Sequence, residues 1–263
     1  METTDDIPLL PPRRRKPAQP AVPLKTALDP SKKYEIGVDE AGRGPLFGRL
    51  YVAGVILPKG DDFDHSRMKD SKKFHSEKKI REVAEYIRQN CLAYHIAYIE
   101  PATIDEINIR QAVLRAMTEC SRVCLSQIQS RHARDLPSDP ALVPHTDVLL
   151  LIDGNDFPPF MVYDETQETM LEIPHETVEG GDNTYTAIAA ASILAKVARD
   201  DYIAECCRLH PALDEKYGLA KNKGYGTKAH LDGIRTHGIS QWHRRSFGIC
   251  QHSPVVPVST VVS

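Results

Sequence analysis

The sequence predicts an α/β core followed by a helical annex, and three observations carry this prediction. Two apolar, β-branched runs come first, at 34–39 and 50–57. Helical and strand patterns then alternate towards the middle of the chain. Beyond residue 185 only helical patterns remain. Strands that alternate with helices and then give way to helices are typical of a sheet flanked by helices with a separate helical part.

The first half of the chain carries the clearest alternation. The runs at 34–39 and 50–57 flank a Gly-Pro turn, which predicts an antiparallel pair. Apolar residues at helical spacing predict a helix over 76–89, and a strand follows at 92–99. The remaining elements expected in this half are a short helical or turn segment and a longer helix, at 101–109 and 112–128.

The second half begins with a polar, proline-bearing stretch at 130–146, which predicts a loop insertion. Residues 148–152 form a continuous apolar run, the pattern of a buried central strand. Residues 156–174 predict a loop or a hairpin, and 177–179 a short strand. Alanine-rich and amphipathic patterns predict two further helices, at 185–209 and 228–237.

Composition bounds the class of protein. The 263 residues, 41% of them hydrophobic, can bury a sizeable core. The 33 Lys and Arg residues against 36 Asp and Glu give a formal charge of −3, so net charge neither supports nor excludes a nucleic-acid partner. The six cysteines lack zinc-ligand spacing and predict reduced thiols in an intracellular protein. No apolar run reaches the length of a membrane span, and we expect a cytoplasmic protein with no membrane partner.

Residues 1–32 are rich in proline, include the basic run Arg13-Arg14-Arg15-Lys16, and predict a disordered tail. A solvating role is the simplest interpretation, with nucleic-acid contact or localisation as alternatives. The expected organisation then continues with a core, a helical annex and a flexible tail, at 33–210, 211–249 and 250–263.

One stretch concentrates the chemistry. The first strand ends in Asp39 and Glu40, and the turn Gly42-Arg43-Gly44 follows. Adjacent residues on a strand point to opposite faces, so at least one of the two acids must reach a cleft, a metal or water. Glycines on both sides of an arginine leave main-chain amides open to a polyanion. An acidic hairpin corner is the alternative for this stretch on its own.

Carboxylates recur at two further segment ends, Asp153 and Asp182, each next to a glycine. If these segments lie side by side, four carboxylates converge at one edge of the sheet. Such a cluster needs counter-charge, because like charges raise each other's pKa, and hard divalent cations prefer carboxylate oxygen. Two Mg²⁺ or Mn²⁺ ions held in this way suit attack of water on a phosphodiester.

The chain resembles the type 2 ribonuclease H (ribonuclease HII) family in several motifs that occur in order. The similarity covers roughly residues 34 to 249, and so many ordered motifs are more specific than any single one. The matching segments are 39–45 (DEAGRGP), 70–73 (DSKK), 107–108 (IN), 153–155 (DGN), 189–200 (AAASILAKVARD), 223–227 (KGYGT) and 243–247 (HRRSF).

The resemblance implies a ribonuclease H-like mixed sheet flanked by helices, with the core at 33–210 as the catalytic part. It places the four catalytic, metal-binding carboxylates on Asp39, Glu40, Asp153 and Asp182. The fourth position differs from the usual family sequence, because this chain has Glu-Gly-Gly-Asp there. Glu179 and Asp200 are therefore rival candidates for it, although Asp200 is expected to pair within its own helix.

The resemblance also implies the substrate-binding residues. The Gly42-Arg43-Gly44 backbone corresponds to the element that reads a ribose 2′-hydroxyl, and Tyr225 to the tyrosine that stacks on the following deoxyribose. A core aromatic is the alternative for Tyr225. The remaining candidates for phosphate or substrate contact are Lys72, Lys73, Asn155, Ser192 and Lys223, with weaker cases for Ser71, Lys196, Lys221, Arg244 and Arg245. The histidines, His243 included, are expected to have surface or packing roles.

The expected activity is that of an endoribonuclease with two divalent ions per site. It would cleave RNA in RNA/DNA hybrids and on the 5′ side of ribonucleotides in duplex DNA, leaving 5′-phosphate and 3′-hydroxyl ends. Ribonucleotide excision repair and RNA primer removal are the roles implied, for a monomeric enzyme without a recognisable sliding-clamp peptide. Two alternatives remain: another two-metal nuclease that cuts all-DNA substrates, and a catalytically silent nucleic-acid-binding subunit.

Overall fold

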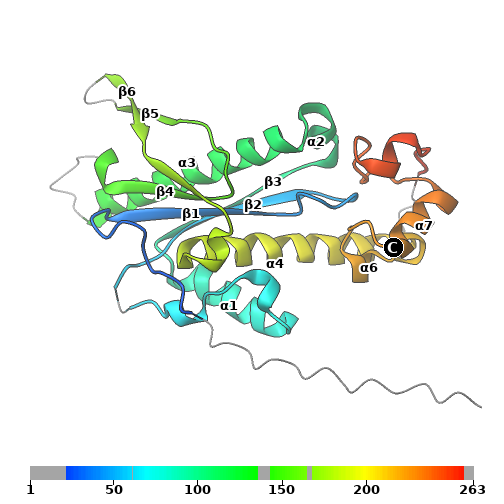
Figure 1. Cartoon of the computed structure of the whole chain (residues 1–263), viewed down its shortest axis with the longest axis horizontal. Coiled ribbons are helices and arrows are strands. Elements are labelled where there is room, and N and C mark those ends of the chain that lie inside the picture. Colours follow the sequence, from blue (N-terminus) through cyan, green and yellow to red (C-terminus); the bar gives the residue numbers. More distant parts are fainter. Residues whose placement is uncertain (1–21, 61, 136–142, 165–167, 258–263) are drawn as a thin grey trace, which may run out of the picture.

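The computed structural model describes residues 22–60, 62–135, 143–164 and 168–257 (Figure 1). Its centre is a five-stranded mixed sheet, and a two-stranded hairpin stands beside it. The strands are β1 (Tyr34–Ala41), β2 (Leu50–Ile56), β3 (Ala93–Ile99), β4 (Val148–Asp153), β5 (Phe160–Asp164), β6 (Thr169–Ile173) and β7 (His175–Val178). The sheet order is β3-β2-β1-β4-β7, with antiparallel pairing among the first three strands and parallel pairing across β1-β4-β7.

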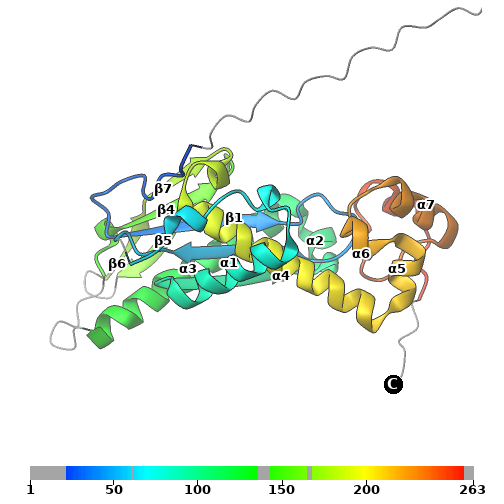
Figure 2. The same ribbon diagram turned by 90° about the horizontal axis from the view of Figure 1, so that it is seen from below.

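Helices cover both faces of the sheet. They are α1 (Glu77–Asn90), α2 (Pro101–Ile107), α3 (Ile109–Asp135), α4 (Thr186–Leu209), α5 (Pro211–Tyr217), α6 (Leu219–Asn222) and α7 (Lys228–His237). Figure 1 shows α3 on one face, with α1 and α4 on the other, and Figure 2 shows α4 running on past the sheet to α5, α6 and α7. The predicted mixed sheet flanked by helices is confirmed.

The alternation of side chains along β1 decides which face each acid reaches. Ile36 and Val38 pack in the hydrophobic cluster under α3, so Gly37 and Asp39 face α4. A Cβ added to Gly37 would lie 2.2 Å from the carbonyl carbon of Ala187, so α4 rests directly on the β1 backbone. This close approach, and the buried alanines of α4, bring the helix over Asp39.

The annex shares a core with the loop that follows β1. Phe47 is fully buried among Ile203 near the end of α4, Leu213 and Tyr217 of α5, and Ile234 of α7. The backbone of residues 46–48 is also tied to the annex, because Leu46 N–H donates to Gly224 and Gly48 N–H to Trp242. The annex and the β1 turn therefore form one packed unit.

Most expected elements are present, and one of the predicted loops differs from expectation. The predicted loop at 130–146 is wrong over 130–135, where α3 continues to Asp135. These last α3 residues are almost all exposed, so they carry no apolar periodicity to indicate a helix. Residues 136–142 lie outside the described part. The stretch 156–174 contains the hairpin β5–β6, one of the two expected alternatives.

Both expected tails contact the folded body where the structure describes them. Residues 22–32 were assigned to the N-terminal tail, yet Lys25 pairs with the backbone at Thr184 and Thr186, and the Leu28 and Asp29 amides donate to the Glu35 carboxylate. At the other end, residues 248–252 form a 3-10 helix (η5) and Val256 N–H donates to Ile239. The packed body therefore extends further in both directions than the predicted boundaries, and residues 1–21 and 258–263 lie outside the described part.

The state of the cysteines agrees with the expectation of free thiols. All six cysteines are free thiols, four of them buried. In the described ranges, no helix combines the length and apolar character needed to cross a membrane.

Candidate active site

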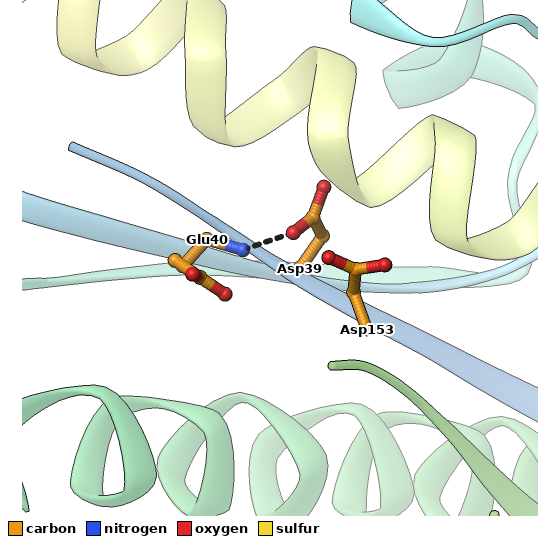
Figure 3. Close-up of side chains that lie close together, drawn as sticks. All are labelled: Asp39, Glu40 and Asp153. Carbon is orange, nitrogen blue, oxygen red and sulfur yellow. Dashed lines mark hydrogen bonds between the residues drawn. The ribbon is translucent and has the colours of Figure 1, made fainter. Parts of the chain in front are cut away.

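Three carboxylates meet where β1 and β4 end side by side. Asp39 and Glu40 come from β1 and Asp153 from β4, and one oxygen of each lies within 4.8 Å of the others. Figure 3 shows Asp39 directed towards α4 and Glu40 towards the α3 side, as strand alternation requires. The Glu40 backbone N–H donates to Asp39 Oδ1 at 2.7 Å, which fixes the Asp39 carboxylate.

The electrostatics of this cluster favour a bound cation. Burial raises the pKa of Asp39 well above its ordinary value, and the charges of Asp153 and Glu40 raise it further. Burial also raises the pKa of Glu40, against the opposing effect of Arg43. Carboxylates this close stay ionised together only if positive charge sits among them, and oxygen donors suit Mg²⁺ or Mn²⁺. The donor set therefore fits a hard divalent ion.

Asp182 lies next to this cluster but outside it. No Asp182 oxygen lies within 4.8 Å of the grouped oxygens of all three other acids. It is buried in the 3-10 turn η4 (Gly181–Asn183), where Asn183 Nδ2 donates to its carboxylate at 3.0 Å. Burial raises its pKa, and Asp70 and Asp153 add to the effect. The preceding amide, Gly181 N–H, donates to Asp153 at 2.7 Å, so η4 is fastened to the metal-binding candidates.

The two rivals for the fourth position lie elsewhere. Glu179 is exposed and accepts a hydrogen bond from Asn155 at 3.2 Å. Asp200 pairs with Lys196 one helical turn away on α4, as expected for a helix-borne acid. Of the three, Asp182 is the buried carboxylate whose pKa responds to Asp153.

The predicted lysines flank Asp182. They belong to the 3-10 turn η2 (Ser71–Lys73), which Asp70 caps by accepting from Lys72 N–H. The Lys72 ammonium is exposed and lies 4.0 Å from an Asp182 oxygen, and that of Lys73 donates to Asn183. Both cations are thus available at the rim of the acidic site.

Ser192 occupies a different position from that expected of a substrate contact. It is buried on α4, its hydroxyl lies 3.0 Å from that of Ser71, and it hydrogen-bonds Asp39. Ser192 therefore joins η2 to the acidic cluster from inside the protein.

Two buried arginines, Arg244 and Arg199, support the turn after β1 from inside the protein, a role that the sequence did not predict for either. Arg244, fully buried, donates to the carbonyls of Gly42 (2.6 Å), Arg43 (3.0 Å) and Gly48 (3.0 Å). The expectation of a phosphate contact from Arg244 is wrong in this respect, because its guanidinium points into the protein. Burial lowers its pKa to about 9, and the nearby charge of Arg199 adds to this.

Arg199 lies directly under Gly42. It is 2% exposed, donates to Lys223 O at 2.7 Å, and has its Nε without a partner. Gly42 has φ +93°, and a Cβ there would lie 2.3 Å from Arg199 Nε, so only glycine fits. Gly44, by contrast, has open space around it, and the Arg43 side chain is 57% exposed. The turn thus presents backbone and one arginine to solvent.

Tyr225 lies across the same arginine. The residue is 49% exposed, and the Arg199 guanidinium carbon lies 5.5 Å from the centroid of its ring. This exposure disagrees with the core-aromatic alternative. Lys223, two residues earlier, is half-buried in a left-handed conformation, φ +52°, at the end of α6.

Asn155 and Arg43 border the acidic cluster. Both line a small cavity of about 20 Å³ together with Asp153 and Arg110. Arg43 Nη1 is 3.7 Å from Glu40, which connects the exposed turn to the carboxylates. Of the weaker phosphate candidates, Arg245 and Lys221 are exposed, while Lys196 is engaged by Asp200.

The fold and the acidic cluster define the class: a ribonuclease H-like nuclease scaffold with carboxylates at the ends of neighbouring strands. Comparison with known proteins agrees. The ribonuclease HII family profile matches residues 36–250. The ribonuclease HII of Parabacteroides distasonis is 40% identical over 215 residues, covering 82% of this chain and 90% of that protein. That of Nitrosomonas europaea is 41% identical over 233 residues, covering 89% and 91%.

Solved structures give the same answer for the fold. An Archaeoglobus fulgidus ribonuclease HII, determined as a complex with PCNA, superposes with a TM-score of 0.52 at 26% identity, covering 82% of this chain and 95% of that one. The ribonuclease H2 of Pyrococcus horikoshii gives 0.53 at 21% identity, covering 83% and 96%. The chain belongs to the ribonuclease HII family, and it is an endonuclease of the ribonuclease H class.

Proposed function

We propose that this endonuclease cleaves the RNA strand of RNA/DNA hybrids and the 5′ side of ribonucleotides embedded in duplex DNA. The observation that carries the proposal is the contact between Arg43 and the acidic cluster. The Gly42-Arg43-Gly44 turn follows directly from the strand that holds Asp39 and Glu40, and Arg43 Nη1 lies 3.7 Å from Glu40. A backbone open to a ribose 2′-hydroxyl thus adjoins the candidate cleavage centre.

Two divalent ions, Mg²⁺ or Mn²⁺, would be held by Asp39, Glu40, Asp153 and Asp182, and would supply activation of water and stabilisation of the leaving oxygen. The protein's own part is to keep these carboxylates in place. Ser192 and the Glu40 amide orient Asp39, and Gly181 N–H orients Asp153. Water attacks phosphorus and the bond from phosphorus to the 3′ oxygen breaks; that oxygen leaves and takes up a proton, which gives 5′-phosphate and 3′-hydroxyl ends.

The substrate would be held by the groups around this centre. Lys72, Lys73 and Lys223 carry charge suited to phosphates, and Asn155 lines the small cavity beside Asp153 together with Arg43. Tyr225 presents a half-exposed ring for stacking on a deoxyribose. We expect a single chain to be active, with roles in ribonucleotide excision repair and RNA primer removal.

One gel separates this proposal from its rivals. Three labelled duplexes, all-DNA, DNA with a single ribonucleotide, and a continuous RNA/DNA hybrid, are incubated with and without Mg²⁺. The proposal expects metal-dependent cutting of the second and third duplexes only. A DNA ligase should be able to reseal the nick, because the expected ends are a 5′-phosphate and a 3′-hydroxyl. Cutting of all-DNA duplex would indicate a general nuclease, and binding without any cutting would indicate a silent subunit.

The identity of the fourth carboxylate is tested by three matched variants. Asp182→Asn, Glu179→Gln and Asp200→Asn each remove one charge from a rival candidate. Asp182→Asn is expected to lower the cleavage rate strongly at a given Mg²⁺ concentration, whereas the other two variants should cleave at close to the wild-type rate. A larger loss in Glu179→Gln than in Asp182→Asn would reassign the position.

A further inference from the structure

Two imidazoles in the annex touch each other in a fully buried setting. His230 on α7 and His243 are 0% and 1% exposed, and their Nε2 atoms are 3.0 Å apart. Tyr217 and Phe47 pack edge-on against the His243 ring, with centroid separations of 4.7 and 5.0 Å. Burial lowers the pKa of both histidines, that of His243 to about 3, so both rings are neutral near pH 7.

The hydrogen-bond partners leave one arrangement of protons. A neutral imidazole has one N–H and one acceptor nitrogen. The Ser240 backbone N–H, which can only donate, lies 3.0 Å from His243 Nδ1, so the His243 proton is on Nε2. His243 therefore donates to His230 Nε2, and the His230 proton must be on Nδ1.

This proton ends on the backbone of Tyr225. His230 Nδ1 is 3.0 Å from the Tyr225 carbonyl oxygen, and Thr227 N–H donates to the same oxygen at 2.7 Å. Both lone pairs of that carbonyl are thus used, and the peptide that carries the exposed tyrosine ring has a fixed orientation.

The same segment also holds the Gly42-Arg43-Gly44 turn. Arg244, the neighbour of His243, donates to the Gly42 and Arg43 carbonyls through its side chain and to Leu46 through its backbone. His243 itself lies against Phe47. One dipeptide, His243-Arg244, therefore reaches the turn in one direction and Tyr225 in the other.

We propose that the buried His243–His230 pair is a positioning device that fixes Tyr225 relative to the Gly42-Arg43-Gly44 turn. It thereby sets the preference of the enzyme for an RNA–DNA junction. This inference rests on the proposed function. The junction is recognised when a ribose meets the turn and the next, deoxy, sugar meets the tyrosine, so the spacing between these two elements decides the selectivity.

Two substitutions at His230 distinguish positioning from simple packing. In His230→Asn the amide occupies the place of Nδ1 and can still donate to the Tyr225 carbonyl. In His230→Gln the amide occupies the place of Nε2 and that bond is lost. The measured quantity is the ratio of kcat/KM on the single-ribonucleotide duplex to kcat/KM on the continuous hybrid, with the melting temperature of each full-length variant.

We expect His230→Gln to lower this ratio about fivefold, the effect of losing one neutral hydrogen bond. His230→Asn should stay within about twofold of wild type. A packing role alone would lower both rates together, in step with the melting temperature, and leave the ratio in both variants at the wild-type value. That outcome would overturn the inference.

A double variant tests whether the effect passes through the tyrosine. On a Tyr225→Ala background, His230→Gln should change the ratio no further, because the positioned ring is absent. A second fivefold fall would show that His230 acts elsewhere and contradict the inference. If the wild-type enzyme cuts neither duplex, the proposed function itself is wrong, a result that the variants cannot mimic.

Discussion

Arg244→Lys should destabilise the protein through the turn that it holds. The guanidinium makes three side-chain hydrogen bonds, to Gly42, Arg43 and Gly48, at 2.6 to 3.0 Å. A lysine ammonium is a single point on a flexible stem and cannot span three carbonyls, so about two bonds are lost. At about 1 to 1.5 kcal/mol each, the loss is about 2 to 3 kcal/mol.

For a chain of this size, 1 kcal/mol shifts the melting temperature by about 2 to 4 °C, so we expect a fall of about 4 to 12 °C. Circular dichroism melting with a denaturant titration measures it. Arg245→Lys is the matched control: it makes the same change one residue on, at an exposed side chain, and should cost under about 0.5 kcal/mol. Equal melting temperatures for the two variants would refute the anchoring role of Arg244.

Three further predictions concern the site. Because the pKa of Asp39 is raised in the folded state, its negative charge destabilises the metal-free protein at neutral pH. Asp39→Asn should therefore raise the melting temperature of the metal-free protein at pH 7.5. This gain should shrink as the pH falls towards the ordinary carboxyl pKa of 3.8. A gain that persists unchanged at pH 4 would contradict this. For the same reason Mg²⁺ affinity, measured by calorimetry, should fall as the pH drops through the raised pKa values of Asp39 and Glu40; a pH-independent affinity would argue against these ligands. Tyr225→Ala should lower cleavage of junction substrates at least tenfold while shifting the melting temperature by under about 2 °C, since about half of the residue is exposed; parallel losses of activity and stability would favour a core role.

Much of the fold could be predicted because the sheet is built from runs whose burial shows in the sequence. Val38 and Ile152 lie in such runs, and the acids that follow them, Asp39 and Asp153, come together because β1 and β4 are parallel neighbours. The sequence alone does not show that these two strands are neighbours, whereas the strand order of the sheet does. The end of α3 was missed because a helix that leaves the sheet needs no apolar face.

The supports of the site could not be predicted in the same way. Arginine is usually exposed and histidine is intermediate, so nothing local in the chain marks Arg199, Arg244 or His230 as buried. Their partners are main-chain carbonyls, some of them distant: Arg244 and Gly42 are 202 positions apart. The only available signal was their place in or next to motifs, because all three lie within a few residues of segments that resemble the family.

Cleavage by Asp153→Asn tests the central claim most directly, with Asp156→Asn as control. Asp156 is three residues on and exposed, and it pairs with Arg110 instead of joining the acidic cluster. On a duplex with one ribonucleotide, in Mg²⁺, the account predicts that Asp153→Asn binds the duplex and leaves it uncut, while Asp156→Asn cuts at a rate within a few-fold of wild type. Undiminished cutting by Asp153→Asn would contradict the assignment of the carboxylate cluster as the catalytic centre.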